Sequence, residues 1–284
     1  MAFEIKQMPD REYFADPGVD QTALKRFMVS PKAYVSYLDY GPDVSADVLD
    51  FGKAAHSLVL DTYERIEDMP NLNTKAGRER LKQLRADDVA VVSADDRERL
   101  HGMYGIANPY FSSLSGRPEV AVFADDPKSG LRLKGKYDFL PDGPDEDGVL
   151  RIRDYKTTGS DPRDFPREAY RLGYHIQAAY YMMLYRLTGY KDQLGFEFVV
   201  QEKKRPYDYM LWRMDEDSQE TIIACRRIGS ALHRMADMKR GRPDEWRHPD
   251  SWQRLMLEHG LDKTPRQVHF TRWQIDHEYG EMNA

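Results

Sequence analysis

The chain has 284 residues, of which 40% are hydrophobic and 32% charged, with 42 basic and 48 acidic side chains and a net charge of −6. That length allows one large domain or two small ones. The charge excludes a protein that coats nucleic acid over its whole surface, but it allows a local basic groove. A single cysteine, Cys225, excludes an internal disulfide framework, a cysteine-built zinc site and a four-cysteine iron–sulfur cluster.

Helix-start signals and apolar periodicity predict a mostly helical first part, about residues 1–115. Asp20 is a suitable N-cap, and Ser30 followed by Pro31 begins a second helix with serine as the cap and proline at the first helical position. The expected helices span residues 22–28, 30–40, 45–63, 74–86 and 93–114.

From residue 116 the pattern changes to strands, and we expect a sheet core over about residues 116–240 and a tail over 241–284. The expected strands span residues 119–124, 131–140, 149–157, 194–201 and 207–214. The expected helices of this part span 174–187 and a long segment from 215 or 218 to 239, with a loop over 159–166. This order predicts one α/β or α+β domain over residues 1–284, a central mixed sheet flanked by helices rather than a tandem βαβ repeat.

The third expected strand carries an acid and a lysine two residues apart, Asp154 and Lys156. Alternate side chains of a strand share a face, so both lie on the face of Leu150 and Ile152, which looks directed to the core. Burying such groups costs free energy unless they bind a metal or each other. An ion pair on an edge strand would explain the same pattern, and Asp-x-Lys alone does not decide between the two.

The preceding strand adds a second carboxylate, Asp138, between apolar residues. Two carboxylates from adjacent strands plus a lysine would hold Mg²⁺ or Mn²⁺ and position a water for attack on a phosphodiester. A simple hairpin register does not set Asp138 opposite Asp154, so we expect a bulge or a strong twist there.

Two helices carry further candidates one turn apart. Gly52 and His56 share a face, and the imidazole could reach a metal, although a helical histidine is often merely packed. Gln177 and Tyr181 also share a face and could bind a DNA phosphate or orient Lys156. An amphipathic helix with partly buried tyrosines is the alternative for the second pair.

The succession G-x-x-x-H, D, D-x-K-T-T and Q-x-x-x-Y resembles the PD-(D/E)xK nuclease superfamily, in its RecB-like branch. It is most similar to the RecE-type (exonuclease VIII) phage recombination exonucleases, over most of residues 12–200. The resemblance implies a restriction-endonuclease-like core. Superfamily members with an iron–sulfur cluster are excluded because this chain lacks the cysteines.

The resemblance implies that His56, Asp138 and Asp154 ligate one or two Mg²⁺ or Mn²⁺ ions, together with the backbone carbonyl of Tyr155. Related nucleases sometimes carry another acid on the strand that holds Glu119. We therefore name Glu119 as a further ligand candidate, with an exposed strand glutamate as the alternative.

Lys156 matches the lysine that orients or activates the attacking water, and with His56, Asp138 and Asp154 it completes the expected catalytic set. Gln177 and Tyr181 match residues that contact DNA near the scissile phosphate. Further DNA contacts are expected from two basic clusters, each of which could instead be a solvated surface. Their residues are Lys75, Arg78 and Lys82 in the first, and Lys203, Lys204 and Arg205 in the second.

The function implied by the resemblance is a metal-dependent exonuclease that degrades one strand of linear duplex DNA 5′→3′, leaving a 3′ overhang. Its implied partners are duplex DNA ends, a RecT-like single-strand annealing protein and further copies of itself in a ring. No apolar run reaches the about 18 residues that span a membrane, so we expect a cytoplasmic protein of a bacterial or phage-infected host cell. A related endonuclease, a single-strand exonuclease and a non-catalytic DNA-binding scaffold are the alternatives.

Overall fold

The computed structural model of the chain describes residues 3–42, 44–62 and 65–240, so the tail expected at 241–284 lies outside the described residues. The strands are β1 (Phe3–Gln7), β2 (Ile66–Asp68), β3 (Ala90–Val92), β4 (Gly116–Asp125), β5 (Arg132–Pro141), β6 (Leu150–Thr158), β7 (Leu194–Glu202) and β8 (Tyr209–Asp215). The helices are α1 (Asp10–Ala15), α2 (Gln21–Val29), α3 (Pro31–Tyr40), α4 (Ala46–Val59), α5 (Lys75–Ala86), α6 (Ala94–Ser112), α7 (Phe165–Leu172), α8 (Tyr174–Arg186) and α9 (Gln219–Arg240).

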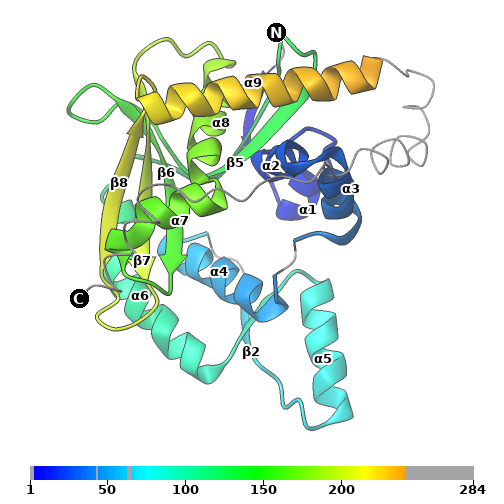
Figure 1. Ribbon diagram of the computed structural model, residues 1–284. Coiled ribbons are helices and arrows are strands. Elements are labelled where there is room, and N and C mark those ends of the chain that lie inside the picture. Colours follow the sequence, from blue (N-terminus) through cyan, green and yellow to red (C-terminus); the bar gives the residue numbers. More distant parts are fainter. Residues whose placement is uncertain (1–2, 43, 63–64, 241–284) are drawn as a thin grey trace, which may run out of the picture.

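Six strands form one mixed sheet in the order β1-β4-β5-β6-β7-β8 (Figure 1). Consecutive strands β4, β5 and β6 pair antiparallel, as the sequence predicted. Strands β6 and β7 pair parallel, with α7 and α8 in the connection between them, because parallel neighbours need a crossover. The expectation of a mixed sheet flanked by helices is confirmed.

The predicted helix starts are confirmed by their caps. The carboxylate of Asp20 accepts a hydrogen bond from the amide of Ala23, and the hydroxyl of Ser30 accepts one from the amide of Ala33. Each cap satisfies a backbone donor that the first helical turn leaves without a partner. These caps fix where α2 and α3 begin.

Several elements differ from the sequence prediction. β1 was missed because it is only five residues long, with two apolar residues, Phe3 and Ile5, and it is long-range pairing with β4 that makes it a strand. β2 and β3 are three-residue strands, too short for a periodic signal. The expected loop 159–166 contains the start of α7, with Pro166 in its first turn, and α4 ends at Val59 rather than at residue 63.

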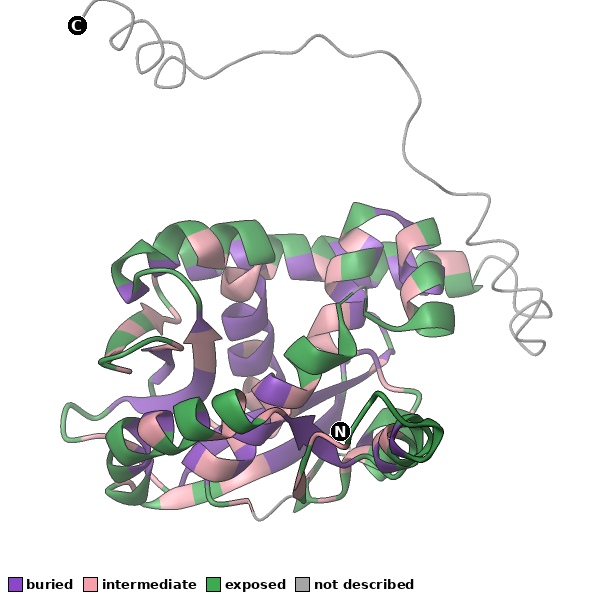
Figure 2. Cartoon of the chain, turned by 90° about the horizontal axis from the view of Figure 1, so that it is seen from below, coloured by how far each residue is buried: buried purple, intermediate pink, exposed green. Residues whose placement is uncertain are grey.

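The sheet has a different helical layer on each face. One core cluster joins the sheet to α2, α3, α8 and α9, and a second joins it to α4, α6 and β3. In Figure 2 the strands are mostly buried, and the outer helices turn exposed faces to solvent. The helices that carry His56 and Gln177 therefore lie on opposite faces, and a site that uses both requires a distortion of the sheet.

Such a distortion occurs at Asp138. Tyr137 packs in the cluster of α8, but Phe139, two residues further along the same strand, packs in the cluster of α4 and α6. In a regular strand these two side chains would share a face. Opposite Asp138 on β4, Glu119 has a positive φ of 53°. The break in alternation that the sequence analysis required is therefore present.

A buried ion network fixes β6 beneath this point. Glu197 on β7 is fully buried and lies 3.3 Å from Arg153 and 2.6 Å from Arg213. Arg153 also reaches Asp145, at 2.6 Å. Buried charges are tolerated only when paired, so this network holds β6 to β7 and β8.

Candidate active site

Three acidic residues form a row across adjacent strands. The register of β4 and β5, in which Pro118 pairs with Phe139, places Glu119 opposite Asp138. Phe139 also pairs with Arg153 of β6, which places Asp138 next to Asp154. The row Glu119, Asp138 and Asp154 thus forms from residues that are distant in the sequence.

His56 reaches this row from α4. Its Nδ1 lies 3.4 Å from Oδ2 of Asp138. Ligand atoms of His56, Glu119 and Asp138 all lie within 4.8 Å of one another, a spacing that one metal ion could bridge. Two carboxylates and one imidazole suit Mg²⁺ or Mn²⁺. The donor set fits a divalent cation, which would supply Lewis-acid neutralisation of phosphodiester charge when bound.

Asp154 is held by two side chains. Its Oδ2 lies 2.5 Å from Nζ of Lys156, and its Oδ1 accepts a 2.6 Å hydrogen bond from Nε2 of Gln177 on α8. Asp154 is 1% exposed and Lys156 is half-buried, and β6 lies between β5 and β7, so this is not the edge-strand ion pair considered from the sequence. Its role as a metal ligand stays a prediction, because the cluster that the structure brings together contains Glu119 instead.

The backbone also takes part in the site. The amide of Tyr155 donates a 2.8 Å hydrogen bond to Oδ2 of Asp138. The Tyr155 ring is buried, packs 5.2 Å from the His56 ring and donates its hydroxyl to Gln201. The predicted role of the Tyr155 carbonyl as a ligand stays a prediction.

Lys136 is a residue of the site that the sequence analysis missed. Its Nζ lies 2.6 Å from Glu119 and also pairs with Asp10 of α1. Glu119 is therefore half-buried and paired, and the exposed glutamate considered as its alternative is wrong. Lys136 precedes Asp138 by two residues, and this Lys-x-Asp order on β5 mirrors Asp-x-Lys on β6.

Burial controls the protonation of the site. It raises the pKa of Asp154 to about 6, and it raises the pKa of Asp138 and, with the help of the Asp138 charge, that of Glu119. Burial also lowers the pKa of His56, which leaves a neutral imidazole suited to metal ligation. For Lys156 burial opposes the charge, but Asp154 and Asp138 raise its pKa above the ordinary value, so it stays protonated.

The raised pKa of Asp154 predicts how stability depends on pH without metal. The folded protein holds this proton more tightly than the unfolded chain, so the contribution of Asp154 is most favourable below about pH 4 and falls by on the order of 2–3 kcal/mol as pH rises through about 6. We expect the Tm of the wild type, relative to Asp154→Asn, to fall over this range in chelator. Differential scanning fluorimetry at a series of pH values measures it. A constant difference from pH 4 to 7 would contradict the shift.

The two residues predicted to contact DNA have other partners here. Gln177 is 5% exposed and donates to Asp154, so it orients the acid rather than Lys156. Tyr181 is 6% exposed, and its ring lies 4.7 Å from that of Tyr137. This agrees with the alternative considered from the sequence, a tyrosine packed in an amphipathic helix. DNA contacts by either residue stay a prediction.

The predicted basic clusters lie on α5 and in the turn between β7 and β8. Figure 1 shows α5 at the periphery of the molecule. Its Arg78 donates to the carbonyl of Leu72, while Lys75 and Lys82 are both exposed on the same helix. Arg205 pairs with Glu98 at 2.8 Å, and Lys203 lies over the ring of Phe51. The DNA-binding role of both clusters stays a prediction.

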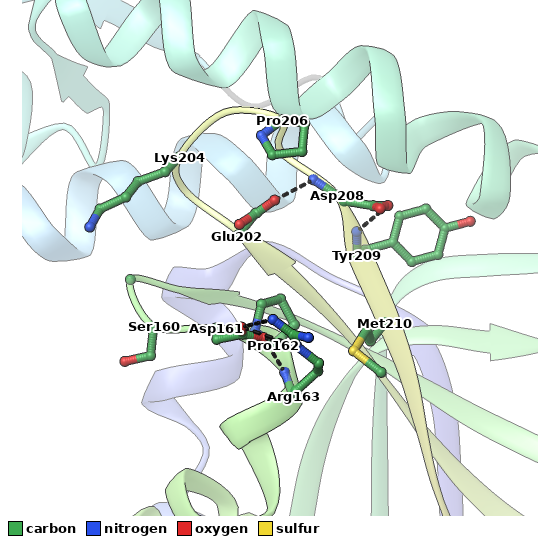
Figure 3. Close-up of a pocket in the computed structure, with 11 residues that line it drawn as sticks. Ser160, Asp161, Pro162, Arg163, Glu202, Lys204, Pro206, Asp208, Tyr209 and Met210 are labelled. Atoms are coloured by element: carbon green, nitrogen blue, oxygen red, sulfur yellow. Dashed lines mark hydrogen bonds and ion pairs between the residues drawn. The ribbon is translucent and has the colours of Figure 1, made fainter.

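A cavity of about 410 Å³ adjoins the second cluster (Figure 3). Three acids line it: Asp161, Glu202 and Asp208. Figure 3 shows Lys204 extending from the turn away from Tyr209. Two cations, Arg163 and Lys204, also line this cavity, so the acids outnumber the cations by one and the cavity does not favour a phosphate group.

A second cleft, of about 440 Å³, opens onto the metal-ligand cluster. His56 and Glu119 lie in its wall with residues of α1 and α4, and Lys53 and Arg85 add positive charge. Arg85 lies 2.8 Å from Asp50 and also contacts Asp47, which ties α5 to α4 beside this opening. Substrate can therefore approach the ligands from solvent.

The comparison of sequences decides the family. The sequence profile of the PD-(D/E)XK nuclease superfamily matches residues 21–274. The chain belongs to this superfamily. A search of curated proteins found no match.

The search of solved structures matched a candidate exonuclease from Eubacterium rectale. It is 15% identical, with a TM-score of 0.53 over 97% of this chain and 99% of that one. A phage-related exonuclease from Haemophilus somnus is 11% identical, with a TM-score of 0.35 over 81% of this chain and 98% of that one. The first likeness shows a shared fold, and superfamily membership supports phosphodiester hydrolysis by a divalent-metal-dependent nuclease.

Among residues 3–42, 44–62 and 65–240, no helix combines the length and the apolar character that crossing a membrane requires.

Proposed function

We propose that this PD-(D/E)XK nuclease is an exodeoxyribonuclease that degrades one strand of linear duplex DNA in the 5′→3′ direction with Mg²⁺ or Mn²⁺. The observation that carries the proposal is the meeting of His56, Glu119 and Asp138 beside the Asp154–Lys156 pair. Five residues expected from the sequence thus lie in one site, as a nuclease requires: His56, Glu119, Asp138, Asp154 and Lys156. The RecE-type character, the strand polarity and the exonucleolytic mode rest on the sequence resemblance.

The residues of the site have separable tasks. Lys156 is protonated, so it can hold and orient a water or a phosphate oxygen by charge and hydrogen bonding, but it cannot remove a proton as a base. Gln177 fixes the orientation of Asp154 from α8. His56 offers a neutral nitrogen from the opposite face of the sheet. Preorganised groups of this kind lower a barrier because they need no rearrangement during the reaction.

The proposal includes partners. The product would be a 3′ single-stranded overhang, and an annealing protein of the RecT type would take it up. Assembly of several copies into a ring around duplex DNA would keep the substrate enclosed between successive cuts, which would explain a processive enzyme.

An end-labelled linear duplex and a closed circular duplex test the proposal, each incubated with Mg²⁺ and with chelator. We expect metal-dependent loss of the linear DNA alone, with early release of the 5′ label as a mononucleotide. Cutting of the circle would identify an endonuclease, and degradation of only a single-stranded control would identify a single-strand exonuclease. DNA binding without cleavage in Mg²⁺ or Mn²⁺ would indicate a non-catalytic scaffold.

A further inference from the structure

A cleft of about 480 Å³ lies between α2, the junction of α7 and α8, and α9. It is separate from the opening that leads to the metal-ligand cluster, and no residue of the site already described lines it. Its walls are formed by Thr22, Lys25, Arg26, Met28, Val29, Tyr170, Arg171, Leu172, Gly173, His175, Ile176 and Arg227.

The cleft concentrates positive charge in a protein with a net negative charge. Four cations line it, Lys25, Arg26, Arg171 and Arg227, and no carboxylate does. Within the described part of the chain, the three arginines form no ion pair. Burial and the nearby Lys156 lower the pKa of Lys25 to about 8, although the charge of Asp154 opposes this shift. A cleft with this charge favours anionic ligands such as phosphate groups.

An exposed aromatic ring lines the same cleft. Tyr170 is 77% exposed, and its ring is stacked on that of His175 with centroids 5.6 Å apart and planes 12° apart. A large aromatic ring left this exposed loses the free energy of burial. Cationic grooves with exposed aromatic rings are the usual means of binding single-stranded nucleic acid, because each base offers a face for stacking.

One tyrosine connects the cleft to the catalytic lysine. Nζ of Lys156 lies 5.0 Å from the ring centroid of Tyr174, and Nζ of Lys25 lies 5.9 Å from the same centroid. Tyr174 is the first residue of α8, and Gly173 before it also ends α7. The Tyr174 ring thus lies between Lys156 of the site and Lys25 of the cleft.

We infer that this cleft binds single-stranded DNA next to the active site, through phosphate contacts to the four cations and base stacking on Tyr170. The inference rests on the proposed function and names the form of the substrate that the site engages. Duplex DNA keeps its bases stacked inside, so it cannot place a base face on Tyr170 except at an end. The bound segment is therefore an unpaired strand at the junction where cleavage separates the duplex.

Equilibrium binding in chelator tests this without cleavage. The probes are a fluorescein-labelled oligothymidylate and a blunt duplex of equal length, followed by fluorescence anisotropy. We expect Tyr170→Ala to weaken binding of the oligothymidylate about tenfold and to leave duplex binding unchanged. We expect the double variant Arg171→Ala with Arg227→Ala to weaken oligothymidylate binding at least about tenfold. The slope of log binding constant against log salt concentration should decrease in magnitude by about one.

Matched controls exist elsewhere on the surface. Tyr40→Ala removes an 85% exposed tyrosine on α3, and Lys128→Ala with Lys191→Ala removes two exposed cations in turns. Both controls are expected to bind the oligothymidylate like the wild type. The substituted side chains of the cleft are exposed, and unchanged Tm values would show that the variants fold.

Two results would overturn the inference. One is oligothymidylate binding within about twofold of wild type for both cleft variants. The other is an equal loss of duplex and single-strand binding, which would make the cleft a general phosphate surface. Cleavage of linear duplex by the wild type, measured in parallel with Mg²⁺, keeps the two proposals apart. Cleavage by the wild type together with normal oligothymidylate binding by the variants would contradict only the inference about the cleft. Absence of cleavage by the wild type would contradict only the proposed function.

Discussion

Replacing Asp154 by asparagine is expected to reduce metal-dependent cleavage of linear duplex DNA by at least about a thousandfold, a loss of about 4 kcal/mol in transition-state stabilisation. The substitution removes the charge beside Lys156 and keeps the shape of the side chain. The amide oxygen of asparagine can still accept the hydrogen bond from Gln177. The charge of Asp138 still stabilises the protonated Lys156, so the fold should survive. Single-turnover cleavage with Mg²⁺ measures the loss.

The control for this variant is Asp237→Asn, which neutralises an exposed carboxylate of α9 that pairs with Arg240. It should cut DNA at the wild-type rate. Asp154→Asn should still bind the DNA, as measured by anisotropy in chelator. Cleavage by Asp154→Asn at the wild-type rate would remove Asp154 from the mechanism and with it the assigned site.

Replacing Lys156 by methionine is expected to slow cleavage by about 10²- to 10³-fold while divalent metal still binds. Methionine keeps most of the buried length of the lysine and lacks its charge. The expected loss follows from the position of Nζ, 2.5 Å from Asp154 and next to the row of acids. Because the lysine is protonated, its contribution is orientation and charge.

Metal binding is the readout that separates this role from a structural one. The rise in Tm that Mg²⁺ or Mn²⁺ produces in the wild type should be retained or increased in Lys156→Met, because a competing cation has been removed. Loss of that rise would show that Lys156 builds the site and does not act in the reaction.

The sequence predicted the parts of the site that lie within one element. Asp154 and Lys156 share a face because strands alternate, and Gln177 faces them because α8 follows β6 in a parallel crossover. Predicting the pairing of Glu119 with Asp138 requires the register of two strands, which local spacing does not fix. The contact of Lys136 with Asp10 depends on α1, a helix that the sequence analysis did not expect.

Surface features were predicted less well than the motifs. The basic runs at residues 75–86 and 203–205 are conspicuous because their members are adjacent in the sequence. The cations of the cleft, Lys25, Arg171 and Arg227, are distant in the sequence and meet only through tertiary packing. α7, which carries Tyr170, begins at the end of the expected loop 159–166, which contains two prolines, and the rest of the helix was assigned to no element.

One carboxylate oxygen of Asp138, Oδ2, faces His56 and also accepts a backbone hydrogen bond. Oδ2 accepts the Tyr155 amide at the point where the ladder between β5 and β6 is reduced to the pair of Phe139 and Arg153. A side chain thus substitutes for a strand carbonyl at the centre of the sheet. A cation that draws electron density from that oxygen would also weaken this hydrogen bond between β5 and β6. We therefore expect occupancy of the site by a cation to weaken the contact between the two strands, with the Tyr155 amide proton as the reporter.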